Sequence, residues 1–159
     1  MLGDFGAFYD KDFERLLPHM KKLICAADII TPNITEAQLL TGIDTEDEKA
    51  LLEALKNIGA KAVVLKGFVK DNTITNYLMN KNGNTTAHSA KFYDAIIHGA
   101  GDFFNASALA HYFKYNNLPD AIDFATQITS DAVKFTIGQE NFENKGICFE
   151  PYLGKISNL

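Results

Sequence analysis

The sequence predicts an α/β fold in which helices cover a mainly parallel β-sheet. Residues 62–65 read Ala-Val-Val-Leu without polar alternation, which is typical of a strand covered on both faces, as strands of parallel sheets are. Helical patterns alternate with such short apolar runs along the chain. Asn82-Gly83, placed between two alternating stretches, indicates one hairpin within this order.

The chain begins with a helical stretch and a short strand. Apolar residues recur at helical spacing over residues 10–27. Because proline costs stability in the middle of a helix, we expect Pro18 to begin a second helix there. The apolar run 28–31 ends at Pro32, which predicts a buried strand that runs into a loop.

Two helices follow, each with recognisable ends. Thr35 and Gln38 have the spacing of a capping box, and Gly42 closes the short helix that they begin. Residues 45–58 form an amphipathic pattern with large apolar residues on one face and Gly59 as the stop. Both segments are therefore predicted to be helices.

The rest of the chain continues this alternation. We expect strands over residues 61–67, 73–80, 85–92 and 146–150, and long helices over 102–114 and 118–135. No internal repeat and no linker rich in proline, glycine or serine interrupts the sequence. Residues 1–159 are therefore predicted to form a single domain.

Composition narrows the class of protein. The 159 residues suffice for one domain with a core, and 15 basic against 20 acidic side chains give a net charge of −5. That balance argues against a general nucleic-acid or anionic-membrane surface. No apolar run is long enough to span a bilayer. Two cysteines without a C-x-x-C pair favour a reducing cytoplasm over a disulfide or zinc framework.

The glycine-rich stretch from His98 to Asp102 is the most informative candidate site. Gly99 and Gly101 flank Ala100 immediately before a predicted helix, where backbone N–H groups favour an anion. Asp102, in the first helical turn, could take a proton from a hydroxyl that attacks a bound phosphate. The same spacing fits a tight turn in which Asp102 caps the helix, so both interpretations stay open.

A second candidate site follows the strand at 28–31. Thr31, Asn33 and Glu36 stand where a strand delivers its loop to the carboxyl edge of the sheet, the usual ligand edge in such folds. Amide and carboxylate oxygens suit a hydrated magnesium ion. A plain strand-to-helix turn, in which Glu36 favours the helix N-terminus, explains the same residues.

Two further stretches are candidates for binding phosphate or metal. Asp4, in a turn-like stretch near Tyr9, could help to hold a metal ion or a phosphate cluster, although a surface turn explains it equally. Lys66 ends the apolar strand that contains residues 62–65, so its ammonium would emerge at the ligand edge. An ordinary exposed lysine at a strand end is the alternative.

Other kinds of site lack their motifs. The sequence contains no G-x-x-x-x-G-K-[ST] run of a Walker-type nucleotide site and no G-x-S-x-G elbow of a serine hydrolase. None of the four histidines has the spacing of a metal site. The aromatic residues of the helix predicted over 102–114 fit a helix core better than a platform for stacking bases.

Taken together in this order, these segments resemble the ribokinase-like superfamily and, within it, the pyridoxal (pyridoxamine) kinases. The resemblance rests on Gly3-Asp4 followed by Tyr9, on ADIITPNITEA at 27–37 and on the loop 98–102. It implies a three-layer sandwich that uses ATP and Mg²⁺ to phosphorylate the primary hydroxyl of pyridoxal, pyridoxine or pyridoxamine. Family members are longer and begin well upstream. The resemblance therefore implies the carboxyl-terminal, nucleotide-binding portion of such a kinase, with the N-terminal part missing.

The resemblance also implies a role for each candidate residue. Asp102 would be the catalytic base, and residues 99–101 would form the anion hole for the transferring phosphoryl group. Asn33 and Glu36 match the N-x-x-E pair that positions magnesium largely through water. The candidates near the ATP phosphates are Asp4, Tyr9, Thr31 and Lys66. We expect Asp4, Asn33, Glu36 and Asp102 to gather at one edge of the sheet.

Ala100 departs from the pyridoxal kinase pattern, which usually has threonine there, whereas the G-A-G-D form is commoner among sugar kinases of the superfamily. A backbone anion hole survives this change. The alternatives are therefore a hydroxymethylpyrimidine or sugar kinase, or a remnant that binds nucleotide without transferring phosphate. Because missing leading strands would uncover a sheet edge and apolar helix faces, we also expect a homo-oligomer.

Overall fold

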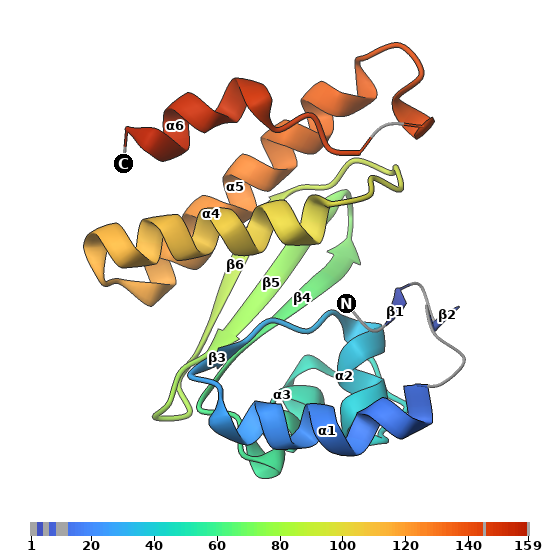
Figure 1. Cartoon of the computed structure of the whole chain (residues 1–159), viewed down its shortest axis with the longest axis vertical. Coiled ribbons are helices and arrows are strands. Elements are labelled where there is room, and N and C mark those ends of the chain that lie inside the picture. Colours follow the sequence, from blue (N-terminus) through green and yellow to red (C-terminus); the bar gives the residue numbers. More distant parts are fainter. Residues whose placement is uncertain (1–2, 5–6, 9–12, 145, 159) are drawn as a thin grey trace. The chain divides into compact units, whose positions relative to one another are not determined.

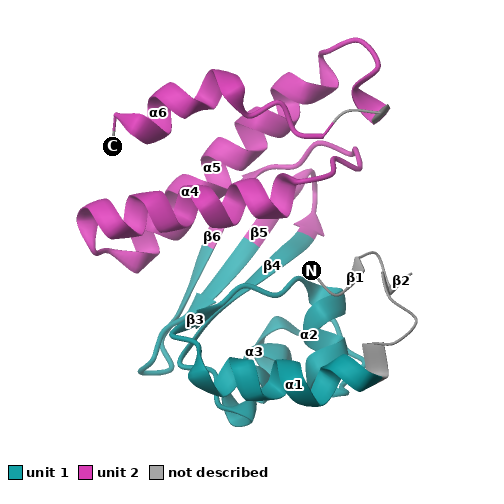
Figure 2. Ribbon diagram, viewed as in Figure 1, with its two compact units in different colours: residues 1–68, 76–87 teal, residues 69–75, 88–159 magenta. Residues whose placement is uncertain are grey.

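The computed structural model (Figure 1) contains both helices and strands and describes residues 3–4, 7–8, 13–144 and 146–158. The chain divides into two compact units (Figure 2). The first comprises Met1–Phe68 and Asn76–Ala87, and the second comprises Val69–Thr75 and His88–Leu159. The boundary between the units falls within three strands of the same sheet.

The main sheet has four strands in the spatial order β3 (Ile29–Ile30), β4 (Ala62–Lys70), β5 (Thr73–Met79) and β6 (Thr85–Lys91). β3 pairs in parallel with β4, as predicted. β4, β5 and β6 follow one another through short turns, which only antiparallel neighbours allow, so the sheet is mixed. A separate two-stranded sheet pairs β1 (Gly3–Asp4) with β2 (Ala7–Phe8).

Two turns join the consecutive strands of the main sheet. Asp71 and Asn72, between β4 and β5, both have positive φ, 49° and 58°, the sign that a two-residue type I′ hairpin turn requires. The hairpin predicted around Gly83 is confirmed: Gly83 has a φ of 85°, and its N–H donates to the Asn80 carbonyl oxygen at 3.0 Å. The turn at Asp71 and Asn72 was not predicted, because Asp-Asn is a weaker turn signal than Asn-Gly.

Helix α1 (Phe13–Ala26) contains Pro18, so the prediction that this proline starts a second helix was wrong. The ring removes one backbone hydrogen bond. Leu17, Met20 and Ile24 of the same helix pack into one apolar cluster, which holds the two halves of α1 in a common direction.

Helices α2 (Ile34–Thr41) and α3 (Glu48–Ile58) end as the sequence predicts. Gly42 and Gly59 close them with φ values of 75° and 119°, which L-residues rarely adopt. α3 begins later than predicted because the Asp47 side chain accepts a hydrogen bond from a first-turn N–H and caps the helix there.

The core of the first unit consists of apolar side chains from its helices and from β4. The most deeply buried are Leu51, Leu52, Leu55, Val63 and Leu65. The unbroken burial of residues 62–65 confirms that this part of β4 is covered on both faces.

The second unit is built on two long helices, α4 (Ala100–Tyr115) and α5 (Leu118–Ile137), which pack against each other. It ends in two 3-10 turns (Phe142–Asn144 and Glu150–Tyr152) and the short helix α6 (Leu153–Ser157). Its core contains Ile97, Phe103, Ile128, Ala132 and Ile147. None of the helices in the described part of the chain is long and apolar enough to cross a membrane.

The strand predicted over residues 146–150 does not form, so that prediction was wrong. The Ile147 N–H donates to the carbonyl oxygen of His98, and the Cys148 N–H donates to the hydroxyl of Thr136, both at 2.9 Å. These N–H groups therefore bind a loop and a helix side chain rather than a neighbouring strand. Pro151 lies in the 3-10 turn that follows.

Candidate functional site

Helix α2 begins at the two residues that the sequence suggests for magnesium. The Asn33 Oδ1 atom accepts a hydrogen bond from the Glu36 N–H at 2.8 Å, and Glu36 Oε2 accepts one from the Asn33 N–H at 3.1 Å. This reciprocal pair is a capping box, and the box predicted at Thr35 and Gln38 was wrong. Gln38 instead donates to the carbonyl oxygen of Thr45 at 3.0 Å.

The loop before α2 runs beside β4. Asn33 forms an isolated parallel bridge with Lys66, and the Lys66 N–H donates to the carbonyl oxygen of Pro32 at 2.9 Å. Thr31 directly follows β3, and Glu36 lies in the first turn of α2. The backbones of these predicted site residues therefore lie together at the carboxyl end of the β3–β4 pair, where ligands of parallel sheets bind.

Lys66 does not end its strand, which is a correction, because β4 continues to Lys70. Gly67 makes this continuation possible with a φ of 95°, and no atom lies within 4 Å of the position that a Cβ would take there. The Gly67 N–H donates to Asn76 Oδ1 at 3.1 Å, and Asn76 is only 4% exposed. The one sequence signal for this conformation is a glycine after a buried apolar run.

The loop before α4 has the conformation that an anion site needs. Gly99 caps the helix with a φ of 84°, and its carbonyl oxygen accepts the Phe103 N–H at 2.9 Å. The N–H groups of Gly101 and Asp102 lie in the first turn, where helix geometry provides no intrahelical acceptor. These N–H groups and the positive end of the helix dipole favour a negatively charged group at this position.

Asp102 is the third residue of α4 and is exposed to solvent. The interpretation in which it caps the helix is wrong, because Gly99 occupies the cap position and the cap has no side-chain hydrogen bond. The Asp102 carboxylate thus lies in the same first turn as the N–H groups of the loop. A carboxylate next to an anion site is the arrangement that an attacking hydroxyl needs for proton removal.

Residues 98–102, the glycine loop, contact the segment that follows α5. The Ile147 N–H binds the His98 carbonyl oxygen, and a Cβ on Gly146 would lie only 3.3 Å from that oxygen. A Cβ on Gly99 would lie 3.6 Å from Ile147 Cγ2, in ordinary contact. This support has no signal in the sequence, because the two segments lie far apart along the chain.

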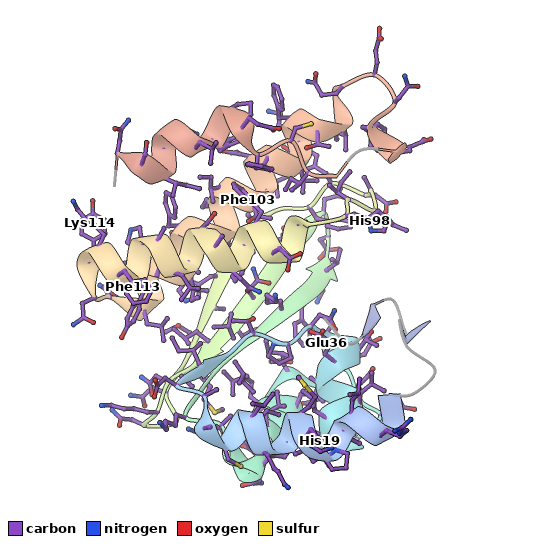
Figure 3. The ribbon with its side chains drawn as sticks, viewed as in Figure 1. His19, Glu36, His98, Phe103, Phe113 and Lys114 are labelled. Carbon is purple, nitrogen blue, oxygen red and sulfur yellow. The ribbon has the colours of Figure 1, made fainter. Side chains whose placement is uncertain are left out.

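The first turn of α4 is also anchored by aromatic packing. Phe103, labelled in Figure 3, is 7% exposed, and its ring centroid lies 6.4 Å from those of Phe149 and Tyr152. The Tyr152 hydroxyl donates to the Asp131 carbonyl oxygen of α5 at 2.8 Å. Burial, and to a lesser degree the Asp131 charge, raise the pKa of Tyr152.

Two of the predicted phosphate-binding residues lie near the N-terminus. Asp4 is placed by its backbone in β1, opposite Ala7, and Tyr9 lies outside the described residues. Asn33 and Glu36 belong to the first unit and Asp102 to the second. The expectation that these groups share one edge of the sheet stays a prediction.

The donor set for a metal consists of oxygen atoms. Within the residues that the structure describes, no group of three or more His, Cys, Asp and Glu side chains could hold a metal ion directly. Asn33 and Glu36 offer amide and carboxylate oxygens, one from each already accepting a backbone hydrogen bond. These residues fit a magnesium ion that keeps several of its waters, and they do not fit a caged transition metal.

Comparison with known proteins shows which family this chain resembles. The family model described as phosphomethylpyrimidine kinase matches residues 12–145. A hydroxymethylpyrimidine/phosphomethylpyrimidine kinase of Staphylococcus aureus (strain MSSA476) is 30% identical over 143 residues, which cover 86% of this chain and 51% of the relative. This chain therefore spans about half the length of the curated relatives that it matches.

Solved structures show the same fold. A putative phosphomethylpyrimidine kinase from Bacteroides thetaiotaomicron, in a crystal form with pyridoxal, has a TM-score of 0.86 and 30% identity, covering 98% of this chain and 58% of the other. Pyridoxal kinase from Lactobacillus plantarum has a TM-score of 0.85 and 29% identity, covering 99% and 59%. With most of its length matched by the family model, this chain belongs to the phosphomethylpyrimidine kinase family, a ribokinase-like family related to the pyridoxal kinases.

Proposed function

We propose that this chain is the nucleotide-binding portion, folded as a single domain, of an ATP-dependent kinase that phosphorylates a hydroxymethyl group on a heteroaromatic vitamin precursor. One observation carries the proposal: the left-handed conformation of Gly99 starts α4 so that first-turn N–H groups and the Asp102 carboxylate share one helix end. Phosphoryl transfer requires positioning and charge stabilisation more than covalent chemistry, and this helix end offers both.

The proposed reaction is an in-line transfer. The acceptor hydroxyl gives its proton to Asp102 while its oxygen forms a bond to the γ-phosphorus of ATP, and the bond to the β–γ bridging oxygen breaks to release ADP. The backbone of Gly99, Ala100 and Gly101 stabilises the charge on the transferring phosphoryl group. A positioned general base contributes about 10²- to 10⁴-fold to such a rate.

The residues at the β3–β4 edge would bind the nucleotide phosphates. Asn33 and Glu36 would orient a hydrated Mg²⁺ ion, which supplies neutralisation of phosphate charge. Asp4, Tyr9, Thr31 and Lys66 are proposed near the ATP phosphates. The backbone bridge between Lys66 and Asn33 supports this assignment for Lys66.

Two acceptors fit the proposal, and each has its own support. Hydroxymethylpyrimidine is favoured by the family model and the curated relatives, and alanine at position 100 departs from the usual pyridoxal kinase pattern. Pyridoxal is favoured by the Lactobacillus plantarum enzyme and by the Bacteroides thetaiotaomicron protein in the crystal form with pyridoxal. Both molecules carry a primary hydroxyl on a nitrogen-containing aromatic ring.

The test uses the purified chain and two measurements. Calorimetric titration with ATP–magnesium measures binding, and transfer of labelled γ-phosphate is then assayed with hydroxymethylpyrimidine, pyridoxal and a sugar. We expect binding and transfer to one of the two vitamin precursors, and loss of transfer in Asp102→Asn with ATP binding retained. Binding without transfer would instead support a nucleotide-binding remnant, and no binding would contradict the proposal.

We also propose that the chain is cytoplasmic and associates with itself. Leu109 and Phe113, four residues apart on α4, are 50% and 81% exposed, and Phe113 projects away from the core of its unit (Figure 3). Apolar side chains at this spacing form one face of a helix. Sedimentation of the native chain and of Phe113→Ser tests this: a monomer in both cases contradicts self-association.

A further inference from the structure

A buried hydroxyl on α5 lies behind the glycine loop. Thr136 is fully buried, and its Oγ1 atom donates to the Ala132 carbonyl oxygen at 2.7 Å. The same oxygen accepts a hydrogen bond from the Cys148 N–H at 2.9 Å. Thr136 therefore uses its hydroxyl both as donor and as acceptor, and it fixes the segment after α5 to a rigid helix.

The segment after α5 also contacts the glycine loop. The residue before Cys148 is Ile147, whose N–H donates to the His98 carbonyl oxygen at 2.9 Å. The Ile147 side chain is 8% exposed and lies against Gly99, and Gly146 lies so near the His98 oxygen that a Cβ would be 3.3 Å away. The His98–Gly99 peptide is thus held by one hydrogen bond and by close packing.

We propose that Thr136 is a positioning residue for the anion hole, acting through Cys148 and Ile147 on the His98–Gly99 peptide. This inference rests on the proposed function for its kinetic consequence, while the structural coupling stands on the contacts alone. The hydroxyl touches neither nucleotide nor acceptor in the proposed mechanism. Its effect is to set the direction in which the N–H groups of the loop point.

The direction of these N–H groups is sensitive to small movements of the loop. Gly99 has a φ of 84°, so its conformation depends on the restraint that surrounds it. Without the Thr136 acceptor, the Cys148 N–H loses its partner, and the segment can shift away from α5. A shift of about 1 Å at a catalytic group can cost on the order of 10²-fold in rate.

The chain offers a matched control on the same helix. Thr126 is 2% exposed, and its Oγ1 atom donates to the Ile122 carbonyl oxygen at 2.7 Å, the same bond along the helix that Thr136 makes. It lies ten residues earlier, which is about 15 Å along α5. Thr126→Val therefore removes an equivalent buried hydroxyl at a distance from the glycine loop.

The experiment compares Thr136→Val, Thr136→Ser and Thr126→Val in the full chain by amide hydrogen exchange and by steady-state kinetics. We expect Thr136→Val to speed exchange at the amides of residues 99–102 by about 10-fold or more. We expect it to lower kcat by about 10-fold while KM for ATP–magnesium changes by less than about 2-fold. Thr136→Ser should restore both, because it keeps the hydroxyl.

Thr126→Val should lower the melting temperature to a similar extent and leave the exchange of residues 99–102 and kcat near those of the native chain. If Thr136→Val changes loop exchange no more than Thr126→Val does, the positioning role is wrong. If the native chain shows no phosphoryl transfer at all, the proposed function fails, and the exchange measurement still decides the coupling between Thr136 and the loop.

Discussion

Asn33 and Glu36 bind each other's backbone N–H groups at the start of α2, at 2.8 and 3.1 Å. The same two side chains are the ones proposed to orient hydrated magnesium. A capping role and a metal-orienting role therefore fall on the same carboxylate, and they differ in what they require. The cap needs an acceptor oxygen, whereas magnesium needs negative charge.

Replacing Glu36 separates these two roles. Glu36→Gln keeps an acceptor for the Asn33 N–H, so we expect the free energy of unfolding to change by less than about 0.5 kcal/mol. Glu36→Ala removes the cap and should cost about 1 kcal/mol. Both variants should raise the magnesium concentration for half-maximal ATP binding by about 10-fold or more. Urea unfolding and magnesium titrations measure the two effects, and unchanged magnesium dependence in Glu36→Gln contradicts the metal role.

Gly99→Ala tests whether the left-handed cap of α4 matters. The space at this position is sufficient, with the nearest atom 3.6 Å from a Cβ, so the cost should come from the φ of 84°. We expect about 1–2 kcal/mol of destabilisation and a loss of phosphoryl transfer. Gly154→Ala is the control, since no atom lies within 4 Å of its Cβ position and its φ is not positive. Equal stability of both variants in urea unfolding would argue against a restrained loop.

Gly59→Ala should be more destabilising than Gly42→Ala. Both glycines have positive φ, 119° and 75°, but only at Gly59 would a Cβ meet another atom, the Cys25 Sγ at 2.9 Å. Backbone strain alone costs about 1–2 kcal/mol, and the clash at Gly59 adds to it. Cys25→Ala should recover part of the loss in a double-mutant cycle of unfolding free energies. Additive effects of the two substitutions would rule out the clash.

Tyr152 should make stability depend on alkaline pH. Its pKa is raised, first by burial and then by the Asp131 charge, so the folded chain holds the phenol proton more tightly than the unfolded chain does. The stabilising contribution is therefore complete below the ordinary tyrosine pKa of about 10 and is lost as pH rises through the raised pKa. We expect the difference in melting temperature between the native chain and Tyr152→Phe to shrink above that pH. A constant difference throughout the alkaline range would show that this linkage is absent.

Several elements were predictable because their signals are local. The apolar run 62–65, the hairpin at Gly83 and the helix ends at Gly42 and Gly59 each depend on a few neighbouring residues. The predictions at Pro18 and over residues 146–150 were wrong because distant parts of the chain decided the outcome. Pro18 stays inside α1 because both halves of the helix pack into one core.

The features of the candidate site also divide into those that the sequence predicts and those that it does not. The sequence alone determined the family, the glycine loop before a helix and the residue types of the proposed base and magnesium pair, because motif spacing and backbone propensity are properties of adjacent residues. Only the tertiary structure decided that the Gly67 N–H binds the Asn76 side chain, and that Thr136 and Ile147 hold the glycine loop. Hydrogen bonds between segments far apart along the chain leave no periodic pattern in the sequence. Only the folded structure therefore shows which groups they join.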